Sequence, residues 1–371
     1  MLTRRDLARN FSVIAAGLAL GGEAAYAQRR KVKGHDPVEV VLLNANENPD
    51  GPPASAIEAM SKILAKTGRY HDEDNDQFSA MVAKSEGLKT EQVLIGCGSS
   101  EILHCAVDAF TSPTKPLITS APAYELPVDM ATAQGHPVIK LPMTAQYGAD
   151  VRRMVAEADK IKGSLIYLVN PNNPTSSITP KADIAWLIDN LPANTVALID
   201  EAYIHFANPS QIASAIPYIN HKKNVVVART FSKIFGMAGL RVGYGLGRPE
   251  LISKMSVFRN NVISLTGVYA AKAAIAEAGT LVPERRAKFD GVRSDLCAWL
   301  DGHKIGFIPP SANFVMIDVK RDVRTVIPAM MDRGVAVGRP FPPMNNFLRV
   351  TIGSESDMAR FKQEFAKVMN V

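Results

Sequence analysis

The chain has 371 residues, of which 47% are hydrophobic, and a formal net charge of +6. This length and hydrophobic content can build one large domain with a smaller one beside it. The basic side chains form no polybasic run and do not alternate with aromatic residues. We therefore expect an anionic small-molecule ligand, not nucleic acid. The three cysteines lack the spacing of metal ligands, so we expect free thiols and no metal site.

The first 27 residues have the pattern of a twin-arginine signal peptide. Arg4 and Arg5 precede an apolar run over residues 11–22, and Ala25-Tyr26-Ala27 is a small-x-small cleavage site. The run is too short to hold the mature protein in a membrane. We expect export by the twin-arginine machinery to the periplasm, without a stable membrane anchor, and a cytoplasmic location if the signal is not used.

Apolar strands alternate with helices over the next two hundred residues. The hydrophobic spacing predicts helices over residues 52–66, 77–86, 101–110, 149–158 and 182–190. Strands are predicted over residues 93–95, 117–119, 138–141, 165–169, 196–199 and 225–228. These strands lack polar alternation, which indicates a sheet covered by helices on both faces. The predicted fold class is therefore α/β, with a doubly wound core.

The order of predicted helices and strands changes after residue 247. Residues 249–278 are predicted to be mostly helical, with further helices over 283–300, 323–333 and 355–369. Strands are predicted over 306–308, 314–317 and 347–352. This is an α+β pattern. We predict four parts: the signal peptide 1–27, an N-terminal segment 28–50 that packs with the small domain, a large domain 51–255 and a small domain 256–371.

Lys233 is the central candidate for chemistry. It lies in Thr230-Phe231-Ser232-Lys233, directly after a predicted strand, with Arg241 eight residues further on. A lysine amine can condense with an aldehyde cofactor, while Ser232 and an arginine can hold that cofactor's phosphate. The alternative is a solvated loop lysine with an ordinary helix cation.

Two further segments follow strands, where ligands of open α/β sheets bind. Gly96-Cys97-Gly98-Ser99-Ser100 precedes a helix, and its hydroxyls and helix N-terminal amides can donate to a phosphate. Tyr124 follows the strand 117–119 and can stack on a ring. Taken alone, the first segment is equally a tight turn, and the tyrosine is equally a packing residue.

Polar residues also follow the strands 165–169 and 196–199. Asn173 lies in a segment with two Asn-Pro pairs, which is a turn by default but can also place an amide donor. Asp200 ends a buried strand, where a carboxylate needs a partner such as a protonated ring nitrogen. Tyr203, three residues on, can reach the same ring. A helix N-cap is the alternative for Asp200.

Arg349 is a charge within an apolar strand of the C-terminal part. Its planar guanidinium suits a substrate carboxylate or phosphate, and Asn313 can assist it. A position on a solvated face of the sheet is the alternative.

Together these residues resemble fold-type I pyridoxal-phosphate aminotransferases, and most closely the histidinol-phosphate aminotransferase branch. The resemblance covers nearly all of the chain after the signal peptide. The matching motifs are Gly98-Ser99-Ser100-Glu101, Asn173-Pro174-Thr175, Asp200-Glu201-Ala202-Tyr203, Ser232-Lys233, Gly239-Leu240-Arg241, Asn313-Phe314 and Leu348-Arg349, with Leu43-Asn44-Ala45-Asn46-Glu47-Asn48-Pro49 and Arg69-Tyr70 typical of the branch.

The resemblance implies a large domain with a mostly parallel seven-stranded sheet, a smaller α+β domain, and the cofactor pyridoxal 5′-phosphate. It also implies the site roles. Lys233 forms the Schiff base, Asp200 pairs with the ring nitrogen, and Tyr124 stacks on the ring. The remaining implied roles are phosphate binding by Ser99, Ser100, Ser232 and Arg241, contact with the ring oxygen by Asn173 and Tyr203, and substrate binding by Arg349, Asn46 and Asn313. Tyr70 is expected to reach the phosphate of the neighbouring subunit, which implies a homodimer.

The implied activity is transfer of an amino group from an amino acid or a phosphorylated amine to a 2-oxo acid such as 2-oxoglutarate. Two alternatives stay open: a decarboxylase of the threonine-phosphate type, and a cofactor-binding protein without turnover. The chain departs from the branch at Ser100, His71 and Ser176, and in the loop Gly338-Arg339-Pro340-Phe341. The cofactor set is intact, while the segments that would tune substrate choice differ, so we expect the reaction class, not the substrate, to follow the branch.

Overall fold

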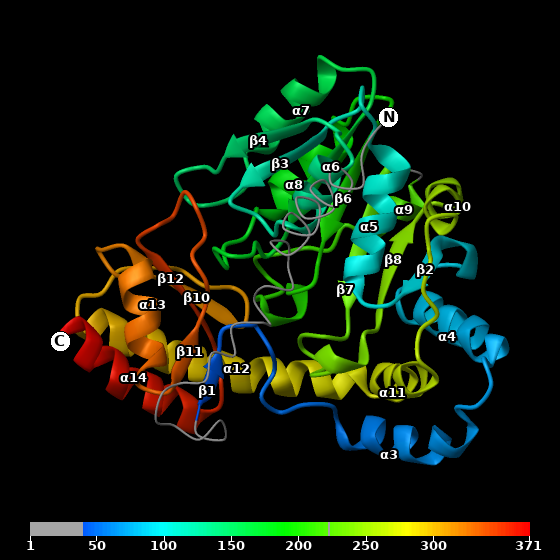
Figure 1. Ribbon diagram of the computed structural model, residues 1–371. Coiled ribbons are helices and arrows are strands. Elements are labelled where there is room, and N and C mark those ends of the chain that lie inside the picture. Colours follow the sequence, from blue (N-terminus) through cyan, green and yellow to red (C-terminus); the bar gives the residue numbers. More distant parts are fainter. Residues whose placement is uncertain (1–39, 222) are drawn as a thin grey trace, which may run out of the picture.

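The computed structural model describes residues 40–221 and 223–371, which fold into a three-layer α/β unit joined to a smaller α+β unit (Figure 1). The predicted signal peptide 1–27 lies outside the described residues. Within the described part of the chain, no helix combines the length and the apolar character needed to cross a membrane.

A seven-stranded sheet forms the centre of the larger unit. Its strands are β2 (Val93–Gly96), β3 (Leu117–Ala121), β4 (Val138–Pro142), β5 (Ser164–Val169), β6 (Thr195–Asp200), β7 (Val225–Thr230) and β8 (Gly243–Gly247). They lie side by side in the order β2-β8-β7-β6-β5-β3-β4. All neighbours pair in parallel except β8, which is antiparallel to both β2 and β7. The predicted fold class, with a mostly parallel seven-stranded sheet, is confirmed.

Helices cover both faces of this sheet. The helices of the larger unit are α3 (Ala54–Ile63), α4 (Asp72–Ser85), α5 (Ser99–Phe110), α6 (Leu126–Ala133), α7 (Val151–Asp159), α8 (Lys181–Asp189), α9 (Ile216–Asn220) and α10 (Pro249–Ser256). In β6, Val196 and Leu198 pack into the buried cluster that includes α5, α6 and α10. Ala197 and Ile199 pack on the other face, in the cluster with α4, α7, α8 and α9. The strands are apolar on both faces because each face is buried.

β8 is a strand that the sequence did not predict, because three of its five residues are glycine. A Cβ atom at Gly243 would lie 2.3 Å from the Ser99 backbone nitrogen, and one at Gly245 would lie 2.6 Å from Ile102 Cγ2. The glycines therefore let α5 approach the sheet closely, and packing, not β propensity, selects them. The short elements α6, α9, β1 (Val41–Leu43) and β11 (Val335–Val337) were also not predicted.

The C-terminal part is built on a small antiparallel sheet. Its strands β9 (Phe307–Ile308), β10 (Phe314–Asp318) and β12 (Phe347–Thr351) pair in the order β12-β10-β9. Beside it, β1 pairs in parallel with β11, so the N-terminal segment adds a strand to this part of the molecule. The helices are α11 (Leu265–Ala276), α12 (Ala278–Gly302), α13 (Val323–Met331) and α14 (Glu355–Met369).

The long helix α12 runs along the base of the molecule and connects its two parts (yellow in Figure 1). It packs on the short 3₁₀ helix Ile204–Phe206 of the larger unit and on α14 of the smaller one. The preceding helix α11 packs on α3 and α4. The domain limits 51–255 and 256–371 stay a prediction.

Candidate active site

Parallel strands bring the predicted site residues to one edge of the large sheet. Asn173 follows β5, Asp200 ends β6 and Lys233 follows β7, and these three strands are neighbours. Tyr124 follows β3, on the far side of β5. Ligands of doubly wound sheets bind at this carboxyl edge.

An anion cradle lies at the start of α5. Arg241 donates from Nη2 to Ser100 Oγ at 3.0 Å and from Nη1 to Ser232 Oγ at 3.3 Å. Ser99 is the first residue of the helix. Gly98 has φ +79°, a backbone conformation that residues with a side chain rarely adopt, and a Cβ atom there would lie 2.3 Å from Arg241 Nη2 and displace the guanidinium. Hydroxyls, a guanidinium and a helix N-terminus converge here, which is the chemistry that binds a phosphate.

Asp200 is a buried carboxylate held by two neutral donors. Its Oδ1 accepts the Ala202 backbone N–H at 3.0 Å, and its Oδ2 accepts the Tyr167 hydroxyl at 3.3 Å. Burial raises the pKa of Asp200 to about 6, against the lowering effect of these hydrogen bonds. A cationic ring nitrogen beside it would favour the ionised form. Sequence reasoning missed Tyr167, although a tyrosine within an otherwise aliphatic strand was a usable signal.

The Lys233 amine faces the N-terminal segment and the other candidate residues. Its Nζ donates to the backbone carbonyls of Asn46 at 3.0 Å and Ala45 at 3.4 Å, and lies 5.5 Å from the centre of the Tyr203 ring. Burial, with a smaller repulsion from Arg349, lowers the pKa of Lys233 from 10.5 to about 8. A neutral amine is therefore accessible close to physiological pH, as a nucleophilic lysine requires.

Arg349 lies within β12, and its guanidinium reaches the ends of the large-sheet strands. It donates from Nη1 to Asn173 Oδ1 at 2.8 Å and from Nη2 to the Asn44 carbonyl at 2.7 Å. Its carbon Cζ lies 4.6 Å from the centre of the Phe341 ring and 5.6 Å from that of Phe314. Burial lowers the pKa of Arg349 to about 10. Its buried Nε has no hydrogen-bond partner among the described residues.

The remaining predicted residues are placed as follows. Asn46 Nδ2 donates to the Tyr203 hydroxyl at 3.1 Å. Asn313 Nδ2 donates to the backbone carbonyls of Asn46 and Glu47, so its amide supports the N-terminal segment. Burial raises the pKa of the Tyr124 hydroxyl to about 12. Tyr70 lies apart on the loop before α4, is 81% exposed, and takes part in none of these hydrogen bonds.

A buried ionic network that sequence reasoning missed lies behind the strand ends. Arg229, in β7, donates to Glu201 Oε2 from Nε and Nη2 at 3.0 and 2.8 Å, and from Nη1 to Glu86 at 3.0 Å. The Tyr244 hydroxyl donates to Glu86 at 2.6 Å. Because Glu201 directly follows Asp200, this network ties the end of β6 to β7 and α4.

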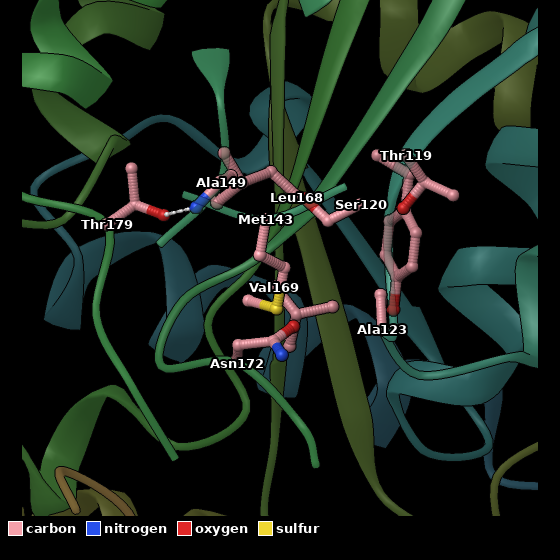
Figure 2. Close-up of a pocket in the computed structure, with 10 residues that line it drawn as sticks. Thr119, Ser120, Ala123, Met143, Ala149, Leu168, Val169, Asn172 and Thr179 are labelled. Atoms are coloured by element: carbon pink, nitrogen blue, oxygen red, sulfur yellow. Dashed lines mark hydrogen bonds between the residues drawn. The ribbon is translucent and has the colours of Figure 1, made fainter. Parts of the chain in front are cut away.

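A small enclosed space lies between β3 and β5, next to the Tyr167 side chain. Figure 2 shows it between residues of β3 and β5 and the Met143 side chain, with the Ala149 N–H bonded to Thr179 Oγ1 at 3.1 Å. It has no room for a water molecule. The buried hydroxyls of Thr119 and Ser120 in β3 have no hydrogen-bond partner within the described part of the chain.

Comparison with known proteins shows the family to which the chain belongs. Residues 38–365 match the model of the family "Aminotransferase class I and II". The chain is 33% identical to histidinol-phosphate aminotransferase 1 of Nitrosococcus oceani, over 89% of each chain. It belongs to the class I and II aminotransferases.

Further relatives agree with this assignment. The chain is 32% identical to histidinol-phosphate aminotransferase 2 of Pseudomonas aeruginosa, over 91% of each chain. The structure of histidinol-phosphate aminotransferase from Sinorhizobium meliloti, solved in complex with pyridoxal 5′-phosphate, superposes with a TM-score of 0.85 at 26% identity, over 95% of each chain. The chain is a pyridoxal-phosphate-dependent aminotransferase.

The residues present fit this cofactor. The cradle of Gly98, Ser100, Ser232 and Arg241 suits its phosphate. The buried Asp200 carboxylate has no cationic hydrogen-bond partner among the described residues, and a pyridinium nitrogen would supply one. When bound, pyridoxal phosphate supplies the electron sink that makes the α-proton of an amino substrate acidic.

We expect cofactor uptake by the apoenzyme to depend on the Lys233 amine. Only the neutral amine attacks an aldehyde, so the rate of covalent uptake should rise with pH, with its midpoint at about 8, and level off above it. Stopped-flow absorbance after mixing with pyridoxal phosphate measures this rate.

Lys233→Ala should show no covalent attachment after borohydride reduction and mass spectrometry. Lys320→Ala, which removes an exposed lysine, is the matched control and should take up cofactor normally. A cofactor-modified peptide from the Lys233→Ala protein would contradict the assignment.

Proposed function

We propose that the chain is a periplasmic, homodimeric aminotransferase whose amino donor carries a carboxylate or phosphate bound by Arg349. One observation supports an amino donor with such an anionic group. The Lys233 amine lies 5.5 Å from the centre of the Tyr203 ring, and the Arg349 guanidinium lies 5.6 Å from that of Phe314, which packs edge-on against Tyr203. The two cations are close enough for Arg349 to lower the pKa of Lys233. A donor whose anionic group is bound by Arg349 would therefore present its α-carbon to the Lys233 amine.

We assign roles to the site residues on the same basis. Lys233 Nζ attaches the cofactor and afterwards moves the proton at the substrate α-carbon. Asp200 holds the ring nitrogen in its charged form, and Tyr124 packs on the ring. Asn173 accepts from Arg349 through Oδ1, so its NH₂ end is available for the ring oxygen together with Tyr203. The phosphate is bound by Ser99, Ser100, Ser232 and Arg241.

The donor is proposed to be an amino acid or a phosphorylated amine similar to histidinol phosphate, with a 2-oxo acid such as 2-oxoglutarate as acceptor. The names of the relatives favour histidinol phosphate. The surroundings of Arg349 differ from the pattern expected for that branch, because Arg339, on the neighbouring loop, pairs with Glu125 at 2.6 Å and stacks on Phe341. The substrate is therefore proposed by chemical class.

An exposed apolar surface supports the homodimer. Large hydrophobic side chains are exposed on α3, on the loop after it and on the segment 257–262, namely Ile57, Leu64, Tyr70, Val257, Phe258 and Val262. Asn261 donates to Glu101 at the start of α5, which ties this segment to the anion cradle. A second copy of the chain covering this surface would bring Tyr70 of the partner subunit to the phosphate.

Periplasmic location is proposed from residues 1–27, which lie outside the described residues. The twin arginines Arg4 and Arg5, the apolar run and the site after Ala27 support it.

The first test is a half-reaction screen on the mature form, residues 28–371. Glutamate, aromatic amino acids and histidinol phosphate are each added to the holoenzyme, and the visible spectrum and the keto product are followed. We expect one donor to convert the cofactor band and yield its keto acid. Lys233→Ala should lower kcat by about 10²–10⁴-fold, the usual contribution of a positioned proton-transfer group. Release of carbon dioxide without keto acid would instead establish a decarboxylase.

Shared sites are tested by mixing subunits. If Tyr70 serves the partner's site, a mixed dimer of Tyr70→Ala and Lys233→Ala subunits has both defects in one site and leaves the other site intact, so co-expression should restore activity that neither variant has alone. Asp200→Ala with Lys233→Ala is the matched control and should restore none, because every site then contains a defect. Equal recovery in both pairs would refute the shared site.

Export is tested by replacing Arg4 and Arg5 with lysine. The variant should stay in the cytoplasmic fraction at full length, while the unchanged protein is recovered from the periplasm without residues 1–27. The same distribution of both forms would exclude twin-arginine export.

A further inference from the structure

Asn46 joins the N-terminal segment to both parts of the molecule. It is 1% exposed and has the left-handed backbone conformation, with φ 54°, that is uncommon for residues other than glycine. Its carbonyl accepts from Lys233 Nζ at 3.0 Å and from Asn313 Nδ2 at 3.1 Å. Its backbone N–H donates to Thr351 Oγ1 at 2.9 Å. All its backbone polar groups are thus engaged with site residues or with β12.

The side chain of Asn46 is held in the same way. Thr351 Oγ1 donates to Asn46 Oδ1 at 3.2 Å, and Asn46 Nδ2 donates to the Tyr203 hydroxyl at 3.1 Å. Thr351 is 2% exposed, and Oδ1 is the acceptor for its single proton. If the amide were turned over, that buried proton would lose its acceptor, which is costly. The Thr351 hydroxyl therefore favours the orientation in which the NH₂ group faces Tyr203.

This orientation decides where the Tyr203 proton points. A hydroxyl oxygen that accepts from an NH₂ group keeps its own proton for another acceptor. In the opposite orientation, Asn46 Oδ1 would itself take the proton of Tyr203. Burial raises the pKa of Tyr203 to about 12, so the hydroxyl keeps its proton at physiological pH.

We propose that Thr351, on β12, is a positioning residue for the cofactor: through the Asn46 amide it aims the Tyr203 hydroxyl proton at the cofactor ring oxygen. This inference rests on the proposed contact of Tyr203 with that oxygen. It assigns a role to a residue of the small sheet that lies 305 positions from Asn46 in the chain. It also changes the role of Asn46 from a substrate ligand to the link between Thr351 and Tyr203.

The test is a pH titration of the visible absorbance of the holoenzyme. Thr351→Val keeps the shape of the side chain and removes the hydroxyl, so the amide can turn and take the Tyr203 proton. Because the deprotonated ring oxygen then loses a donor, the titration midpoint should rise by about one pH unit, equivalent to ~1.4 kcal/mol. We expect kcat to fall about tenfold, with a smaller change in the KM of the donor. Thr351→Ser should restore the midpoint.

Thr119→Val is the matched control. It makes the same substitution at a buried threonine whose hydroxyl has no partner among the described residues, so the midpoint should not move. Asn46→Asp provides a second variant should Thr351→Val not fold. It places an acceptor where the NH₂ group stood, and it should raise the midpoint in the same way.

A double-mutant cycle separates positioning from general loosening. Tyr203→Phe should raise the midpoint by itself, and Thr351→Val should add nothing in that background. Additive shifts, a wild-type midpoint in Thr351→Val, or an equal shift in Thr119→Val would overturn the proposal. These spectra need no donor, so failure of the donor screen leaves this test intact.

Discussion

The structure depends on an amine that burial prepares to lose its proton near physiological pH. Burial lowers the pKa of Lys233 to about 8, and the carbonyls of Ala45 and Asn46 accept from its Nζ, so the amine is desolvated but not left without partners. A carboxylate paired directly with this lysine would favour the ammonium form and remove its nucleophilicity. Neutral carbonyl partners avoid this, and they explain why the N-terminal segment crosses the site.

Two opposite demands are met at the ends of the neighbouring strands β6 and β7. Asp200 has to be ready to ionise against a cationic ring, while Lys233 has to be ready to lose its proton. Burial favours the neutral form of both groups. It raises the pKa of Asp200 to about 6 and lowers the pKa of Lys233 to about 8. The ionic network of Arg229 with Glu201 and Glu86 lies behind the sheet edge, where one guanidinium pairs with two carboxylates. Because Arg229 pairs with these two glutamates and not with Asp200, the protonation of Asp200 can change when the cofactor binds.

The sequence predicted those site residues that lie at the end of a strand or directly after it in the chain. Asp200 and Lys233 are polar residues at the ends of apolar strands, and parallel pairing alone brings them together. Thr351 could not be found in this way, because its importance depends on which residues it faces across the fold. Tyr167 was signalled only by its place in an aliphatic strand, which does not reveal its partner Asp200. β8 was missed for a related reason: its glycines are required by the close approach of α5, which the sequence does not reveal.

The same distinction explains why reaction class is better determined than substrate. Most of the residues proposed to contact the cofactor lie at the ends of strands of one sheet. Arg349 comes from β12, and its environment is assembled from Asn44, Asn173 and Phe341. Gly338 leaves no space for a side chain, because a Cβ atom there would lie 2.7 Å from the Arg349 carbonyl oxygen. The loop at Gly338 is therefore packed against the backbone of Arg349, and a shift of either one would move the other. If Arg349 binds the substrate as proposed, substrate choice depends on the contact between the two parts of the molecule, which no single motif encodes.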